Sequence, residues 1–294
     1  VLANASHLEN VCAKLGAPAA RTFAVVLEPA GRNTAAVAAI AASLGAQIAP
    51  EALVLLAPAD HLIPDRQAFV ASIARAAPIA RERIVTFGIS PDRPETGYGY
   101  IKRGEALAEG VFAIDSFREK PNLDTARSYL AEGGYSWNAG MFLFSARVML
   151  EEFSAHAPAI KQAALGALET ARREDGAIYP SLEAFQAIPS ESLDIAIMEK
   201  TRRAALAPCA IGWADVGSWS ELWRLARKDQ SGNALQGAAA VLDGANNLVR
   251  GDGVKVCAAG VSDLIIIATS EGVIVLPRER AQDVKTLKQL AAKL

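Results

Sequence analysis

The chain has 294 residues, a formal net charge of −2 and a pI near 6.0. This balance argues against a nonspecific nucleic-acid binder, because such proteins need a broad basic surface. Hydrophobic residues make up 51% of the chain and charged residues 21%, so an ample core can be buried and wholesale disorder is not expected.

Cysteine usage and hydropathy favour a cytoplasmic protein without membrane contact. Cys12, Cys209 and Cys257 are widely separated and form no C-x-x-C pair. This fits a reduced compartment and gives no support for a zinc site or a disulfide framework. No apolar run reaches membrane-spanning length.

The first part of the chain alternates apolar runs with helical patterns. Strands are predicted at residues 1–3, 22–27, 53–56 and 83–88, and helices at 6–15, 34–46 and 65–77. Thr34 is the expected N-cap of the second helix, and Pro78 is expected to end the third. This alternation is typical of a parallel, doubly wound sheet.

The stretch LVLLAPADH at residues 53–61 contains a candidate ligand residue. Its four consecutive apolar residues predict a strand buried on both faces of a parallel sheet. Pro58 ends this strand, and Asp60 follows at the carboxyl end, where open α/β sheets bind ligands. Asp60 is therefore either a metal or phosphate-site residue, or a residue that caps the next helix or makes a turn.

The residue pattern in the second part of the chain changes near Asp229. Before it, strands are predicted at residues 110–117, 138–144 and 204–211, and helices at 123–132, 147–172, 182–200 and 218–226. After it, short β-rich runs over 237–276 are separated by turns, and an amphipathic helix is expected over 280–294. We therefore predict two domains, 1–230 and 231–294; no internal repeat is evident.

A second carboxylate, Asp215, follows the predicted strand at 204–211. Together with Asp60 it would make a hard-oxygen site at one edge of the sheet, suited to Mg²⁺ bound with substrate phosphates. The alternative is that Asp215 caps the helix that begins near Ser218.

The loop EPAGRNT at residues 28–34 combines groups that recognise nucleotides. Arg32 can contact a phosphate or a base, and Asn33 can recognise an amide-like base edge. The alternative is a tight strand-to-helix turn in which Asn33 and Thr34 only cap. The motifs around Glu119-Lys120-Pro121, at 96–100 and at 137–140 are by themselves compatible with ordinary loops and strands.

Taken together, these motifs resemble one enzyme family. EPAGRNT, LLAPADH, TGYGYI, FREKP, WNAGMF, SLDIAIMEK and GWADVGSW occur in the order and spacing seen in mannose-1-phosphate guanylyltransferases, including the bifunctional enzymes that carry a phosphomannose isomerase domain. The C-terminal section ending in QDVKTLKQL resembles the small β-helical region of the same enzymes. The resemblance implies an α/β fold with a Rossmann-like, mostly parallel nucleotidyltransferase sheet and a small C-terminal β-helical domain.

The resemblance also implies the reaction and its residues. GTP and mannose 1-phosphate would give GDP-mannose and pyrophosphate with Mg²⁺ as cofactor, and no nucleic acid or membrane would take part. Asp60 and Asp215 would hold the Mg²⁺, and Lys120 would lie near the sugar phosphate. The nucleotide-binding residues would be Glu28, Arg32, Asn33 and Thr34. The sugar-binding residues would be Gly97, Tyr98, Glu119, Asn138, Gly140, Asp194 and Glu199.

The sequence departs from the family at its beginning. The family's first strand and G-G-x-G-T-R loop, which wraps the triphosphate with backbone N–H groups, have no counterpart after Val1. We therefore expect an N-terminally incomplete enzyme with little activity. The alternatives are a non-catalytic sugar-nucleotide-binding or regulatory homologue, and another nucleotidyltransferase or a glycosyltransferase. The sequence does not report the oligomeric state, for which a homodimer is one option.

Overall fold

The computed structural model describes residues 1–15 and 25–291. Part of the strand predicted at 22–27 and the last residues of the predicted C-terminal helix lie outside these ranges. The chain divides into two compact units: unit 1 comprises Val1–Ala59 and Ile63–Trp213, and unit 2 comprises Asp60–Leu62 and Ala214–Leu294. The domain boundary predicted at residues 230 and 231 stays a prediction.

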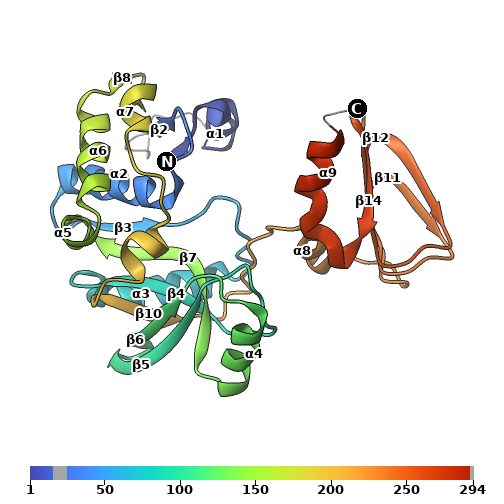
Figure 1. The fold of residues 1–294 in the computed structure, drawn as a ribbon, viewed down its shortest axis with the longest axis horizontal. Coiled ribbons are helices and arrows are strands. Elements are labelled where there is room, and N and C mark those ends of the chain that lie inside the picture. The colour runs from blue at the N-terminus through green and yellow to red at the C-terminus, as the bar shows by residue number, and fades with distance from the viewer. Residues whose placement is uncertain (16–24, 292–294) are drawn as a thin grey trace. The chain divides into compact units, whose positions relative to one another are not determined.

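Unit 1 contains two sheets and the helices that pack on them (Figure 1). Its strands are β1 (Leu2–Asn4), β2 (Val25–Glu28), β3 (Leu53–Leu56), β4 (Ile84–Ile89), β5 (Tyr100–Ala108), β6 (Val111–Arg118), β7 (Tyr135–Ser145), β8 (Arg172–Glu174), β9 (Ala177–Tyr179) and β10 (Ala204–Pro208). Its helices are η1 (Ala5–His7), α1 (Leu8–Leu15), α2 (Asn33–Ile48), α3 (Arg66–Ala80), α4 (Leu123–Glu132), α5 (Ala146–His156), α6 (Pro158–Glu169), α7 (Leu182–Gln186) and the π-helical turn η2 (Asp194–Met198).

The predicted α/β class is confirmed, and the sheets are mixed. The smaller sheet has the order β1-β2-β9-β8, with parallel pairing between β1, β2 and β9. The larger sheet has the order β3-β7-β4-β10-β6-β5, in which β4 and β10 are parallel and β7 runs antiparallel to β3 and β4.

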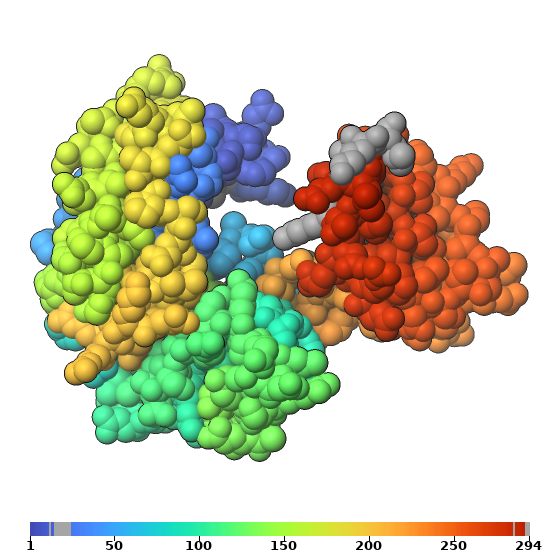
Figure 2. Space-filling model, viewed as in Figure 1, coloured from blue at the N-terminus to red at the C-terminus, as the bar shows by residue number. Residues whose placement is uncertain are grey.

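Helices cover both faces of the larger sheet, as a doubly wound fold requires. The alanine-rich helix α2 packs with α5 and α6 against Phe142 and Phe144. Helices α5 and α6 form the yellow-green surface in Figure 2. Helix α3 packs on the opposite face against Phe87 and Met141. Fully buried alanines such as Ala38 and Ala39 let the helices approach closely.

The predicted burial of residues 53–56 is wrong. In the described part of the chain β3 pairs with β7 alone, so it is an edge strand, and Leu55 is 39% exposed. Its partner β7 lies between β3 and β4 in the sheet and runs antiparallel to both. An apolar run indicates a strand but does not identify the neighbours that bury it.

Two predicted helix boundaries are also wrong. Pro78 lies inside α3, which continues to Ala80, and the turn is completed by N–H groups of Glu82 and Arg83 that donate to the Ile79 carbonyl. Helix α2 begins at Asn33, whose side-chain oxygen accepts from the Thr34 N–H at 2.9 Å.

Five strands of the larger sheet close into a ring. Besides pairing with β6, β5 pairs with β7 through Tyr100–Trp137, Ile101–Ser136 and Lys102–Tyr135. The strands β7, β4, β10, β6 and β5 therefore follow one another around a closed circuit of hydrogen-bonded neighbours. This circuit places segments that are distant in sequence around a common interior.

Unit 2 is a mostly parallel β-structure with helical segments packed on it. Its elements are α8 (Trp219–Leu225), β11 (Ala234–Leu242), β12 (Leu248–Ala259), β13 (Leu264–Thr269), β14 (Gly272–Pro277), η3 (Arg278–Asp283) and α9 (Val284–Ala291). Strands β11, β12 and β13 are parallel and β14 is antiparallel to β13. Leu248, Ile265 and Leu276 form its core with Trp219 and Trp223. Among the described helices of both units, none has the length and apolar character needed to cross a bilayer.

Candidate functional site

Asn138 is the centre of a polar cluster in unit 1. The Asn138 Oδ1 accepts from the Thr86 hydroxyl at 2.7 Å and from the Gly140 N–H at 3.2 Å, and its Nδ2 donates to Asp194 Oδ1 at 2.8 Å. Asn138 is 8% exposed and Thr86 is fully buried. Because the amide oxygen is occupied by these two donors, the amide presents its NH₂ group to Asp194.

Asp194, at the start of η2, is a carboxyl group with a perturbed pKa. Burial, the largest cause, and the nearby Glu119 charge raise this pKa from 3.8 to about 6, against the opposing effects of Asn138 and Lys120. A carboxyl group that titrates near neutrality is typical of functional sites.

Glu119 follows β6 and contacts the carboxylate of Glu199 and the ammonium group of Lys120. The Glu119 N–H donates to Glu199 Oε1 at 3.3 Å, and the Lys120 Nζ lies 3.2 Å from Glu119 Oε1. The Lys120 side chain is 63% exposed, whereas that of Glu119 is 16% exposed. The structure therefore brings together Glu119, Lys120, Asn138, Asp194 and Glu199, which the motif resemblance assigns to the sugar side.

The remaining predicted sugar-side residues belong to the neighbouring loop and strands. Gly97 is exposed and its N–H donates to Glu95 Oε1 at 3.0 Å. Tyr98 packs edge-on against Trp137 and Trp213, with ring centroids 5.2 and 5.3 Å apart. Gly140 has φ +66°, a conformation that favours glycine.

The predicted nucleotide loop lies between β2 and α2. Burial raises the pKa of Glu28. The Arg32 Nη2 donates to the Gln186 carbonyl at 2.6 Å, and its buried Nε has no hydrogen-bond partner in the described chain. Asn33 has φ +63°, so the loop holds a polar side chain in a conformation that asparagine tolerates better than most residues.

A short segment connects this loop to the carboxylate cluster. The Thr34 hydroxyl accepts from the Leu193 N–H at 2.9 Å, and the Ala35 N–H donates to the Glu191 carbonyl at 3.2 Å. Leu193 directly precedes Asp194. Thr34 therefore anchors η2, which is a different role from the capping predicted for it.

Asp60 and Asp215 both belong to unit 2. Leu62 and Ala214 form an antiparallel bridge, with N–H to carbonyl distances of 2.8 and 3.1 Å, and the two carboxylates lie beside this bridge in the chain. Burial lowers the pKa of the neighbouring His61, and the charges of both Asp60 and Asp215 oppose this effect.

Neither carboxylate serves as the helix cap considered as its alternative. Ser218 is the N-cap of α8 and Asp65 is the N-cap of α3. Asp215 Oδ1 accepts from the Gly217 N–H at 3.2 Å.

The two carboxylates beside this bridge are hard oxygen donors of the kind that bind divalent cations. Mg²⁺ is commonly held by one or two carboxylates, with substrate phosphates completing its coordination. Within the described residues, no group of three or more His, Cys, Asp or Glu side chains is arranged to hold a metal, so this pair would depend on the substrate for further ligands.

Sequence reasoning missed two residues of the cluster. Thr86 orients Asn138, but a threonine inside an apolar strand gives no signal of its own. Gly99 belongs to the TGYGY motif, and a Cβ there would lie 2.7 Å from Glu119 Oε2 and 3.3 Å from Asn138 Cβ. A larger residue at position 99 would therefore push the Glu119 carboxylate away from its present place and press on Asn138.

The comparisons with known proteins define the class. The nucleotidyl transferase family model matches residues 1–232, and the MannoseP isomerase/GMP-like beta-helix domain model matches residues 237–290. The chain belongs to the nucleotidyl transferase family, and the predicted β-helical C-terminal region is confirmed.

Individual relatives show which members of this family the chain is similar to. The chain is 42% identical over 292 residues to the mannose-1-phosphate guanylyltransferase of Escherichia coli, covering 97% of this chain and 61% of that protein. It is 41% identical to the alginate biosynthesis protein AlgA of Pseudomonas aeruginosa, covering 97% of this chain and 60% of that protein. The chain thus spans about three-fifths of the length of these curated relatives.

A solved structure shares the fold of this chain. The crystal structure described as mannose-1-phosphate geranyltransferase from Thermus thermophilus is 30% identical, with a TM-score of 0.83, and the match covers 98% of this chain and 83% of that chain.

Proposed function

We propose that this chain carries the guanylyltransferase site that transfers GMP from GTP to mannose 1-phosphate, giving GDP-mannose and pyrophosphate. The observation that carries the proposal is the Thr34–Leu193 hydrogen bond of 2.9 Å, because it connects the candidate nucleotide loop to the candidate sugar cluster through one residue. The Escherichia coli relative, which is named a mannose-1-phosphate guanylyltransferase and is similar over 97% of the chain, supports the same reaction.

On the sugar side, the proposal gives the clustered polar groups distinct roles. The carboxylates of Glu119, Asp194 and Glu199 accept hydrogen bonds from mannose hydroxyls, and Asn138 is held by Thr86 in one amide orientation. Gly97, Tyr98 and Gly140 frame the sugar. Lys120 is exposed, and its ammonium group is the cation available to the sugar phosphate.

On the nucleotide side, the loop from Glu28 to Thr34 reads the base. Glu28, Arg32 and Asn33 offer a carboxyl group, a guanidinium and an amide at the carboxyl end of β2, where nucleotides bind in open α/β sheets. Asp60 and Asp215 would hold the Mg²⁺, which neutralises phosphate charge when it is bound. Family membership supports a divalent metal, and the choice of magnesium is part of the proposal.

The reaction needs positioning rather than a protein nucleophile. A phosphate oxygen of mannose 1-phosphate attacks the α-phosphorus of GTP, the bond to the bridging oxygen of pyrophosphate breaks, and pyrophosphate leaves with that electron pair. The protein contributes by aligning the two substrates and by placing the Lys120 charge near the developing negative charge.

The test is a two-part measurement on the 294-residue chain. Formation of GDP-mannose is followed with GTP, mannose 1-phosphate and Mg²⁺, with UTP and glucose 1-phosphate as competing substrates. Calorimetric titration with GDP-mannose, with and without Mg²⁺, measures binding independently of turnover. Lys120→Gln and Glu119→Gln should each weaken both readouts.

The outcomes separate the candidate functions. Preference for UTP or glucose 1-phosphate would reject the substrate assignment. Tight binding of GDP-mannose that does not depend on metal, without turnover, would favour the non-catalytic regulatory homologue. The expectation of low activity stays a prediction, and turnover comparable to that of the curated relatives would contradict it.

A further inference from the structure

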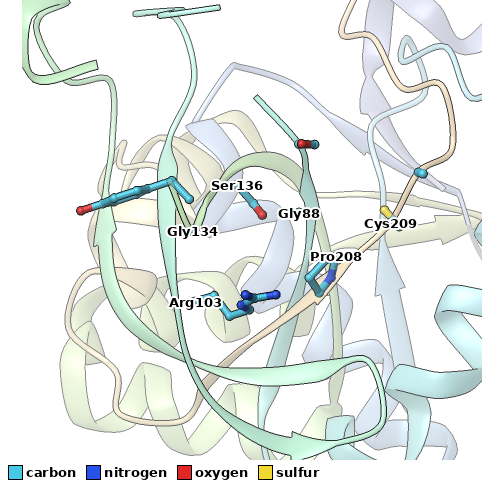
Figure 3. Close-up of a pocket in the computed structure, with 9 residues that line it drawn as sticks. Gly88, Arg103, Gly134, Ser136, Pro208 and Cys209 are labelled. Carbon is cyan, nitrogen blue, oxygen red and sulfur yellow. The ribbon is translucent and has the colours of Figure 1, made fainter. Parts of the chain in front are cut away.

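A pocket in unit 1 is lined by residues other than those assigned above. It has a volume of about 460 Å³ and opens among β4, β5, β7 and the end of β10, four of the strands that form the ring. Gly88, Ser90, Arg103, Ser136, Pro208 and Cys209 contribute to its lining (Figure 3). None of the residues assigned to the sugar, the nucleotide or the metal lines it.

Arg103 supplies a cation to this pocket. Its guanidinium stacks 4.9 Å above the Phe112 ring, and no carboxylate of the described chain pairs with it. Figure 3 shows this guanidinium extending into the pocket from β5. The lining contains no aspartate or glutamate, so the charge of Arg103 is not neutralised there.

Ser136 supplies a hydrogen-bond donor that the described chain does not use. The residue is 9% exposed, and its hydroxyl has no hydrogen-bond partner among the described residues. Figure 3 shows the hydroxyl directed into the pocket. A ligand can therefore accept this hydrogen bond without breaking an existing contact of the protein.

The backbone at position 88 preserves this arrangement. A Cβ on Gly88 would lie 2.8 Å from Ser136 Cβ and 3.1 Å from its Oγ, so a larger residue would displace the serine. The exposed Ser90, two residues further along the chain, adds another hydroxyl to the lining.

The part of the pocket lining formed by Cys209 is neutral, and the charge of Arg75 acts on it. Burial raises the pKa of Cys209 to about 11, so its thiol stays protonated, while the Arg75 charge acts on it in the opposite direction. The wall therefore carries no negative charge that would repel an anion.

We propose that this pocket binds the phosphate group of a small phosphorylated molecule. A guanidinium fork and serine hydroxyls are the donors that recognise tetrahedral phosphate oxygens. The volume exceeds that of a phosphate group, which leaves space for the organic part of the ligand. The site is separate from the catalytic proposal, since it shares no residue with it.

The test uses the 294-residue chain and inorganic phosphate as the probe. Phosphate is titrated at constant ionic strength, and binding is followed by the rise in Tm and by calorimetry, since a ligand of the native state stabilises it. Arg103→Gln and Ser136→Ala should each weaken phosphate binding by about tenfold, the effect of losing one charge-assisted hydrogen bond. Arg173→Gln, which removes an exposed arginine from β8, is the matched control and should leave binding unchanged.

Two comparisons make the test decisive. Without phosphate, Ser136→Ala should have an unchanged Tm, because the hydroxyl has no partner in the described part of the protein; this separates lost binding from misfolding. Lys120→Gln should leave binding to this pocket intact. The proposal is overturned if phosphate gives no saturable response, if Lys120→Gln alone abolishes it, or if acetate binds equally well.

Discussion

The Thr86 hydroxyl donates a hydrogen bond of 2.7 Å to Asn138 Oδ1, and this contact fixes which end of the amide faces Asp194. The same hydroxyl lies 3.1 Å from the Met141 carbonyl, so it joins two positions on β7. Thr86 acts through Asn138 and is a positioning residue.

Replacing Thr86 by valine keeps the shape of the side chain and removes this donor. We expect Thr86→Val to destabilise the protein by about 1 kcal/mol and to raise KM for mannose 1-phosphate more than it lowers kcat. Thr86→Ser retains the hydroxyl and should preserve KM. Equal kinetics for the valine and serine variants would show that the amide orientation does not depend on this contact.

Asp194 should make stability depend on pH in the direction opposite to that of a salt-bridged carboxylate. Its pKa is about 6 in the folded protein against 3.8 ordinarily, so between these values the native state holds a proton that the unfolded state has lost. The stabilisation is complete below pH 3.8 and disappears as the pH rises through about 6. It amounts to about 3 kcal/mol.

The check is urea denaturation of the wild type and of Asp194→Asn at pH values from about 4 to about 7. The difference in unfolding free energy between the two proteins should favour the wild type increasingly as the pH falls. Glu119→Gln removes the neighbouring charge and should reduce this dependence on pH. A constant difference across the range would mean that Asp194 titrates normally.

The sequence predicts the members of the candidate sugar cluster better than it predicts the residues that hold those members in position. Motif resemblance identifies Glu119, Asn138, Asp194 and Glu199, and the structure places them together. Thr86 could not be predicted from the sequence, because its role depends on the pairing of β4 with β7. This pairing joins residues that are far apart in the sequence. Local patterns carry no information about such a neighbour.

The same limit explains the errors in the fold. Leu53 pairs with Ser145, so the exposure of β3 depends on a strand much later in the chain. Unit 2 is similar: Ala234, Leu248 and Ile265 occupy one row of the sheet, yet their unequal spacing in the sequence hides the repeat. The prediction for α4 was accurate, since the helix spans the expected residues 123–132 and its capping signals are local.

Arg147 should contribute stability that is sensitive to salt. Its guanidinium contacts Glu51 at 2.6 Å, Glu82 at 2.8 Å and Glu151 at 3.1 Å, which joins the segment before β3, the turn after α3 and helix α5. Arg147→Lys cannot hold three carboxylates in this fork geometry, so its Tm should fall.

Because the three carboxylates are exposed to solvent, the difference between Arg147→Lys and the wild type should shrink at about 1 M NaCl, where screening is strong. Arg173→Gln should leave Tm unchanged at either salt concentration. A difference that persists at high salt would show that packing of the side chain, rather than charge, accounts for the effect.

Asn247 should be the most sensitive polar position in unit 2. It is fully buried, its Nδ2 donates to Asn233 Oδ1 at 3.0 Å and to the Val261 carbonyl at 2.8 Å, and its Oδ1 accepts from the Leu264 N–H at 2.9 Å. Asn247→Ala leaves these partners unsatisfied inside the β-structure, at a cost of about 3 kcal/mol.

The neighbouring Asn246 provides the matched control, because it has φ +57° and Asn246→Gly suits that conformation. Hydrogen exchange at the Leu264 amide measures the effect directly. It should accelerate by about two orders of magnitude in Asn247→Ala, as a loss of about 3 kcal/mol implies, and stay near the wild-type rate in Asn246→Gly. Equal exchange rates in both variants would show that the side chain of Asn247 does not hold the neighbouring strands of the sheet together.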